Sequence, residues 1–420
     1  MTRHAPGGGT GPGTGRVTRR GLLGGAAGAA GGAALAAGAG LAMARDDTTT
    51  PDEGDLRYSA DGPHQAGILT PVQRHACYLA GDVTTDREGL RRLLDTLTAR
   101  IRALTAGGPV GDDGLVRTAA DNGILGDDLP TAGLTITVSV GASLFDRRFG
   151  LAPRRPARLV PMPAFADDAL DPAWCGGDLL VQVCADEPDV VVHAVRDLLR
   201  ATRGDLQVRW RRDGFTSPPR PSGTPRNLLG FKDGTANPDV SDDALMDRLV
   251  WTHGGGGEPD WVEGGSYHVV RLIRMFVEFW DRVSVREQNA IFGRDKSSGA
   301  PLTGTDEFDP PDYTGQSGGG AIRLDAHIRR ASRSGTAPDQ RILRRGFNYD
   351  AGLDAAGNLD MGLIFTCFNA DLERQFTAIQ RRLEGEALSD YVSPFGGGFY
   401  FALPGLGSGE GGWARAVLGT

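Results

Sequence analysis

One pattern occurs twice in this chain. An apolar run is followed by Ala-Asp and then by a segment whose apolar residues recur at helical spacing, first over residues 179–199 and again over residues 363–383. Short apolar runs of this kind are typical of buried strands, and apolar residues spaced by three or four are typical of helices that pack on a sheet. The repeated strand–helix unit therefore predicts two modules of the same fold.

The segments around these units complete the two modules. Helices that cover one face of an antiparallel sheet define the α+β class, and the repeat predicts duplicated ferredoxin-like modules. The first module is expected over residues 67–220 and the second over residues 221–420. Residues 207–211 are expected to close the first module as an edge strand. The other predicted strands are residues 75–79, 134–140 and 267–275, and the other predicted helices are residues 86–104 and 284–292.

The first 44 residues are expected to be a targeting segment. Arg19 and Arg20 precede a stretch rich in Gly, Ala and Leu, which ends in the small-residue cleavage pattern Ala42-Met43-Ala44. A membrane anchor is the alternative, but Gly and Ala side chains offer little apolar area for insertion. We expect a twin-arginine signal peptide over residues 1–44, export of the mature chain, and a disordered polar linker over residues 45–66.

Charge and cysteine content limit the partners and the covalent chemistry. The formal net charge is -8, and removal of residues 1–44, with four arginines and no acidic residue, gives -8 - 4 = -12. An acidic chain is not expected to bind nucleic acid or an anionic membrane surface. No Cys-x-x-Cys spacing is present, so buried free thiols are expected, with one disulfide after export as the alternative. The four cysteines are Cys77, Cys175, Cys184 and Cys367.

A glycine-flanked loop at residues 230–238 carries one carboxylate, Asp233. His327 follows Asp233 by 94 residues, and Arg344 follows His327 by 17 residues. Taken alone, Asp233 is typical of a turn, His327 of a structural histidine and Arg344 of a solvated surface charge. An imidazole can also bind a metal, a carboxylate can transfer a proton, and an arginine can stabilise negative charge.

Taken in order, these segments resemble the dye-decolorizing peroxidases, and among them the exported bacterial deferrochelatase/peroxidase branch. The segments are residues 230–238, 325–330 and 341–346, together with the glycine-rich residues 390–405. The resemblance covers most of the chain after the targeting segment. It implies a dimeric α+β barrel built from the two modules, with one haem b per chain. The haem is expected to be noncovalent, because the chain has no Cys-x-x-Cys-His motif.

The resemblance also implies a role for each candidate side chain. His327 is expected to be the axial ligand of the haem iron, and Asp390 to accept the other ring N–H of that histidine. Asp233 is expected on the opposite face of the haem, where it moves a proton of the peroxide. Arg344, preferred over its neighbour Arg345, is expected to contact the cofactor and to stabilise negative charge as the O–O bond breaks.

Further haem contacts are implied on both sides of the cofactor. Gly234, Thr235 and Ala236 retain the family pattern beside the loop carboxylate. The propionate contacts depart from it, because family members carry Asn-Pro-Arg shortly after the histidine and this chain has Ser-Arg-Ser at residues 332–334. Arg333 is expected to take the place of the family arginine.

The implied function is that of an exported haem peroxidase. It reduces hydrogen peroxide to water and oxidises organic donors such as dyes and phenolics through an oxoferryl intermediate. Bulky donors are expected to pass electrons through Tyr391, since Trp280 and Tyr400 lie in apolar runs typical of core. Stable membrane insertion is not expected after signal cleavage, and a homo-oligomer is left open. One alternative is a haem-handling protein, which carries haem or releases its iron with incidental peroxidase activity. Another is a haem-free binding protein of the same duplicated fold.

Overall fold

The computed structural model describes residues 56–110, 119–314, 322–332, 338–407 and 412–419. Residues 50–420 form one compact unit. The expected signal peptide, residues 1–44, lies outside the described residues. No helix within the described ranges is long and apolar enough to cross a membrane.

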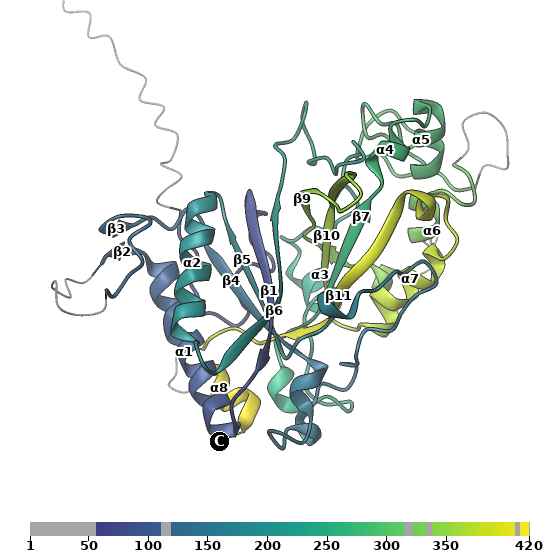
Figure 1. The fold of residues 1–420 in the computed structure, drawn as a ribbon. Coiled ribbons are helices and arrows are strands. Elements are labelled where there is room, and N and C mark those ends of the chain that lie inside the picture. The colour runs from purple at the N-terminus through teal and green to yellow at the C-terminus, as the bar shows by residue number, and fades with distance from the viewer. Residues whose placement is uncertain (1–55, 111–118, 315–321, 333–337, 408–411, 420) are drawn as a thin grey trace, which may run out of the picture. The chain divides into compact units, whose positions relative to one another are not determined.

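The first module has the predicted strands and helices. Its strands pair antiparallel in the order β4-β5-β1-β6, and its two long helices pack against this sheet (Figure 1). The first helix begins where predicted, because the Asp86 carboxylate accepts a hydrogen bond from the Gly89 N–H at 2.8 Å and caps the helix end. The elements are β1 (His75–Val83), α1 (Arg87–Ala106), β4 (Thr135–Gly141), β5 (Leu179–Ala185), α2 (Pro188–Ala201) and β6 (Leu206–Phe215), with a small separate sheet of β2 (Gly108–Pro109) and β3 (Asp128–Leu129).

The second module repeats this arrangement. Its strands pair antiparallel in the order β9-β10-β7-β11, and when strands are numbered within each module, both modules have the order 2-3-1-4. The second predicted strand–helix unit is β10 followed by a π-helical turn, η7, and α7. The duplicated ferredoxin-like fold is thereby confirmed. The elements are β7 (Ser266–Met275), β9 (Phe347–Leu353), β10 (Leu359–Asn369), η7 (Glu373–Thr377), α7 (Ala378–Leu383) and β11 (Val392–Ala402).

The two sheets join into a closed barrel, as the resemblance implied. β11 pairs with β4 over residues 400–402, and β6 meets β9 at Phe215 and Asn348. The ring closes because β7 pairs with β10 as well as with β11. Large aromatic side chains from both modules meet in a buried cluster inside this barrel, which includes Tyr78, Trp210 and Tyr400.

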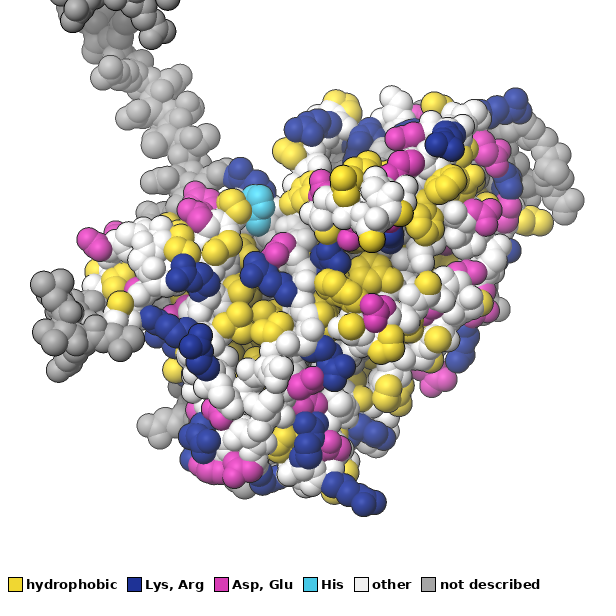
Figure 2. Space-filling model, viewed as in Figure 1, with side chains coloured by type: hydrophobic (Ala, Val, Ile, Leu, Met, Phe, Trp, Pro, Cys, Tyr) yellow, Lys and Arg dark blue, Asp and Glu magenta, His cyan; other side chains and the backbone are white. Residues whose placement is uncertain are grey.

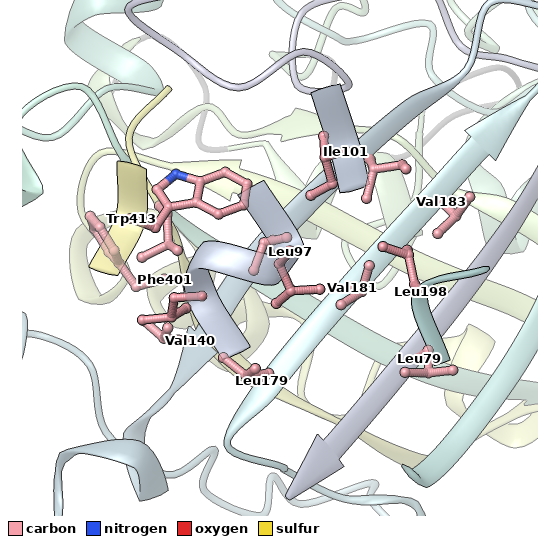
Figure 3. Packing of buried hydrophobic residues seen from close by; sticks show 14 of the residues in the cluster. Leu79, Leu97, Ile101, Val140, Leu179, Val181, Val183, Leu198, Phe401 and Trp413 are labelled. Atoms are coloured by element: carbon pink, nitrogen blue, oxygen red, sulfur yellow. The ribbon is translucent and has the colours of Figure 1, made fainter. Parts of the chain in front are cut away.

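The largest hydrophobic cluster of the described residues fills the space between the first module's sheet and its helices and extends to apolar side chains of β7, β10 and β11. Leu97 and Ile101 of α1 point toward Val181 of β5, and Trp413 of the C-terminal helix covers one end (Figure 3). The predicted apolar face of α1 is therefore the buried one. On the face drawn in Figure 2, acidic and basic side chains are interspersed around exposed hydrophobic side chains near its middle.

Shorter elements connect the strands and carry the candidate site residues. The loops around them bring α5, α6 and the segment after α7 close to the second module's sheet (Figure 1). The shorter elements are η2 (Ala142–Phe145), η3 (Ala152–Arg154), η4 (Pro172–Trp174), α3 (Asp243–Leu249), η5 (Asp260–Val262), α4 (Val277–Trp280), α5 (Val285–Phe292), α6 (His327–Ala331), η6 (Pro338–Gln340), β8 (Leu343–Arg344), η8 (Ala387–Tyr391) and α8 (Gly412–Leu418).

Two expectations were wrong in part. The linker predicted to be disordered over residues 45–66 is ordered from residue 56, because its polar groups bond to the barrel. Buried Gln65 bonds to the backbone of Val138 and Leu403 at 2.7–2.8 Å, and the His64 ring stacks on Trp251 with centroids 3.6 Å apart. β6 is not an edge strand, since it pairs with β1 and meets β9.

The four cysteines are free thiols, and all except Cys175 are buried.

Candidate active site

The loop that carries Asp233 is held in one conformation by its own backbone and by a neighbouring side chain. The Asn227 carboxamide oxygen accepts hydrogen bonds from the N–H groups of Leu229 and Phe231 at 3.1 and 3.2 Å. The Asp233 N–H donates to the Pro225 carbonyl at 2.9 Å. Gly234 has a φ of 104°, which side chains other than hydrogen rarely allow. Gly234, next to the carboxylate, is thus required by the turn itself.

A buried carboxylate, Glu307, fixes both sides of this loop. It pairs with Lys232 at 3.0 Å, and both side chains are less than one-tenth exposed. Its other oxygen accepts hydrogen bonds from the hydroxyls of Thr224 at 2.5 Å and Thr235 at 3.0 Å. Thr235 was expected to contact haem, and in this structure its hydroxyl bonds to Glu307. Sequence reasoning missed Glu307, because a lone glutamate in a polar loop has no recognisable pattern.

Arg344 lies on the short strand β8, which Asn237 ties to the Asp233 loop. The Asn237 side chain donates to the Arg344 carbonyl at 2.8 Å and accepts from the Arg344 N–H at 3.1 Å. The Arg344 guanidinium pairs with the Asp233 carboxylate and lies 5.5 Å from the Phe365 ring centroid. Two side chains that stand 111 residues apart in the sequence are thereby held together.

His327 is the first residue of α6, and a carboxylate holds its ring. The Nδ1 atom lies 2.7 Å from an Oε atom of Glu386, whose side chain is 9% exposed. Burial of the ring is the largest single effect and lowers its pKa, but the charge of Glu386 and its hydrogen bond together outweigh burial, so the pKa of His327 is raised above its usual value. The positive charge of Arg344 lowers this pKa and the negative charge of Asp233 raises it.

The expected proximal role of Asp390 is corrected by this contact. Asp390 is exposed, in the 3₁₀ turn Ala387–Tyr391, and Glu386 just before that turn holds the His327 ring. Asp390, only four residues further along, makes no hydrogen bond or ion pair with His327 in the described part of the chain. The Glu-Gly-Glu run at residues 384–386 was the available signal, but the sequence did not indicate which carboxylate faces the ring.

The surroundings of His327 suit a haem. Phe292 packs against the histidine with ring centroids 5.9 Å apart, and Phe231 stacks on Phe292 at 3.9 Å. The Nε2 atom of His327 has no hydrogen-bond partner among the described residues, and the Nε atom of Arg344 is buried there without one. A ring nitrogen left free beside an apolar cluster, with its other nitrogen fixed by a carboxylate, is the arrangement of an axial haem ligand. The apolar residues of this cluster include Trp280, Ile291, Leu363 and Leu388.

The remaining predicted residues are placed as follows. Gly234 and Ala236 lie in the same loop as Asp233, and the Ala236 carbonyl accepts a 3.4 Å hydrogen bond from Arg341. Arg333 lies outside the described residues. Tyr391 is partly buried with its ring 5.0 Å from that of Trp280. Trp280 and Tyr400 are fully buried, as expected of core.

Comparisons with known proteins agree with this geometry. Residues 65–216 match the family described as Dyp-type peroxidase, N-terminal, and residues 224–407 match Dyp-type peroxidase, C-terminal. Deferrochelatase of Escherichia coli strain K12 is 50% identical over 366 residues, which cover 86% of each chain. A DyP-type peroxidase from Cellulomonas bogoriensis is 38% identical with a TM-score of 0.79, covering 88% of this chain and 99% of its own. Ferric DtpA from Streptomyces lividans is 36% identical with a TM-score of 0.78, covering 88% of this chain and 100% of its own. The chain therefore belongs to the Dyp-type peroxidase family of haem-dependent enzymes.

Proposed function

We propose that this chain reduces hydrogen peroxide at a haem held by His327, with Asp233 as the proton-transferring residue and Arg344 as the charge-stabilising residue. The observation that carries this proposal is the Asp233–Arg344 ion pair, which Asn237 holds by two hydrogen bonds to the Arg344 backbone. A protein that only stored haem would need neither a loop carboxylate nor an arginine fixed in this way.

Each side chain has a defined task in this reaction. A haem held by His327 would supply the two electrons needed to cleave the O–O bond, and organic donors would restore them. Asp233 takes a proton from one peroxide oxygen and returns it to the other, which leaves as water. Arg344 presents a guanidinium to this region, and that group stabilises the negative charge on the departing oxygen.

Glu386 is a positioning residue in this proposal. A carboxylate 2.7 Å from Nδ1 accepts that N–H and leaves the Nε2 lone pair directed away from it, available to iron. The carboxylate also makes the imidazole a stronger electron donor. Gly234 and Ala236 stay assigned to the haem contact surface, and Arg333 to the propionates.

The donors are proposed to be small or bulky organic molecules, including dyes and phenolics. Bulky donors would deliver electrons through Tyr391, the partly buried tyrosine beside Trp280. We further propose export by the twin-arginine route, with the mature chain beginning at Arg45. N-terminal sequencing of the exported protein checks the cleavage site, and normal export of an Arg19→Lys, Arg20→Lys double variant would contradict the route.

A second candidate function is removal of iron from haem, which the name of the 50% identical Escherichia coli deferrochelatase denotes. One experiment separates the two functions. The haem-loaded protein is mixed with peroxide in a stopped-flow spectrometer, and in parallel its haem is followed for metal-free porphyrin by fluorescence.

The variants for this experiment are Asp233→Asn and Arg344→Leu, with two exposed residues as controls, Asp239→Asn and Arg147→Leu. Peroxidase function predicts that both site variants lose at least about tenfold in the peroxide reaction while both controls stay near the parent. Unchanged peroxide rates together with porphyrin release would favour the iron-removing function.

A further inference from the structure

Arg212 on β6 is enclosed by aromatic rings from three other elements. Its guanidinium carbon lies 4.4 Å from the ring centroid of Trp174 in η4 and 4.6 Å from that of Tyr349 in β9. The Phe395 ring of β11 lies 5.6 Å away. A cation over aromatic faces is attracted by the negative face of each ring, so this arrangement stabilises the charged guanidinium.

No carboxylate neutralises Arg212 within the described part of the chain. The two other arginines of the same strand segment each have one, since Arg209 pairs with Asp82 at 3.0 Å and Arg211 with Asp213 at 2.8 Å. The chain as a whole is acidic, so the missing partner does not reflect a shortage of carboxylates.

The hydrogen-bonding groups of Arg212 are unused as well. Its Nε atom is buried with no hydrogen-bond partner among the described residues. Its two terminal nitrogens also bond to no described residue, but they are not fully buried. A buried, unbonded N–H is costly, whereas a guanidinium that binds an anion satisfies its N–H groups in pairs.

Solvent partly reaches the site, because Arg212, Trp174 and Phe395 are each only partly buried. Arg212 pairs with Tyr78 across β1, so its side chain lies on the barrel-interior face. Beside it, β6 meets β9 at a single residue pair, Phe215 and Asn348, and the ladder between the two modules ends there. Trp174 and Phe395 are only partly buried, with their rings in edge contact at 5.7 Å.

We propose that Arg212 and its three rings form a binding site for a planar aromatic anion, an aromatic carboxylate or sulfonate. The guanidinium fork matches the two oxygens of such a group, and the partly buried rings of Trp174 and Phe395 offer apolar contact for the attached aromatic ring. An inorganic anion would interact only with the guanidinium charge, and a neutral aromatic molecule would contact only the aromatic rings. Among the described residues, none of these four side chains contacts His327, Asp233 or Arg344, so the site does not depend on the proposed peroxide chemistry.

The test is calorimetric titration of the haem-loaded full chain with 2-naphthalenesulfonate. Sodium sulfate supplies the charge alone, and 2-naphthalenesulfonamide supplies the ring without the charge. We expect one site per chain for the sulfonate, affinities at least about tenfold weaker for both comparison compounds, and no shift of the haem absorption band.

Variants assign the binding to Arg212. Arg212→Gln should weaken sulfonate binding at least about tenfold, and Arg209→Gln, which removes a charge from the same strand, should leave it unchanged. If Arg212→Gln does not fold, Trp174→Leu removes one ring and should weaken binding about threefold or more. No binding to the parent, equal affinity for the neutral sulfonamide, or binding that shifts the haem band and ignores these variants would overturn the proposal.

Discussion

Replacement of Glu386 by Gln tests the proximal arrangement most directly. Its carboxylate lies 2.7 Å from the Nδ1 of His327 and is largely buried, so the neutral amide removes a charge that water cannot replace. Loss of a partner that orients a metal-binding histidine typically costs about 10–100-fold in affinity, or about 1.4–2.7 kcal/mol. We expect haem to leave Glu386→Gln about 10–100 times faster, and the iron reduction potential to rise because the imidazole donates less electron density.

The assay is transfer of haem from each variant to excess apomyoglobin, followed by absorbance. Asp390→Asn is the matched control, because it makes the same chemical change on the exposed carboxylate four residues away. The rate of haem loss from Glu386→Asp should lie between those of the parent and of Glu386→Gln, because the aspartate keeps the charge on a shorter side chain. Faster haem loss from Asp390→Asn than from Glu386→Gln would refute the assignment of Glu386.

Four further predictions follow from the same contacts. Asp233→Asn and Arg344→Leu should each slow the peroxide reaction at least about tenfold in stopped-flow measurements, and equal rates in parent and variants would contradict their roles. Asn237→Ala should slow the same reaction and leave haem dissociation unchanged, because it removes the hydrogen bonds to β8 and none to His327. Faster haem dissociation with an unchanged peroxide reaction would contradict this prediction. Burial lowers the pKa of His268 to about 3. The unfolded chain therefore takes up this proton as the pH falls through about 6.5, whereas the folded chain stays neutral down to about pH 3, so the free energy of unfolding decreases as the pH is lowered. His268→Gln should remove about 2 kcal/mol of that decrease between pH 6.5 and 4.5 in urea unfolding. Tyr391→Phe should slow turnover of bulky dyes and leave the peroxide reaction unchanged, and equal losses in both would indicate damage near the proximal side instead.

The fold could be predicted because its signals are local. Period and length identified the strand–helix unit at residues 179–199 and again at residues 363–383, and α1 buries the face that its spacing indicated. The order of residues 56–66 could not be predicted in this way. Gln65 lies in a polar segment, and what fixes it are backbone groups of Val138 and Leu403, which only the folded barrel brings within reach.

Only those site residues that lie in segments resembling a known family could be predicted from the sequence. Asp233, His327 and Arg344 were identified because their segments, taken in order, resemble those of a known family, and the structure holds the first and last of them in one ion pair. Glu386 and Asp390 are chemically alike and four residues apart, so composition and spacing cannot distinguish them. A 3₁₀ turn decides which one faces the ring, and turn geometry is set by packing of the whole segment against the second module.

The hydrogen bonds of Asn237 and Glu307 explain how side chains on loops keep a fixed geometry in this site. Loops that carry functional groups are usually mobile, yet here each side of the Asp233 loop bonds to a different part of the chain. Glu307 fixes the loop through Lys232 and Thr235, and Asn237 joins it to β8 by two hydrogen bonds. The ion pair between Asp233 and Arg344 is thus set by the backbone positions of both residues as well as by their mutual attraction. A preorganised pair of this kind can act on a peroxide without first being assembled, which is the condition under which charge stabilisation is most effective.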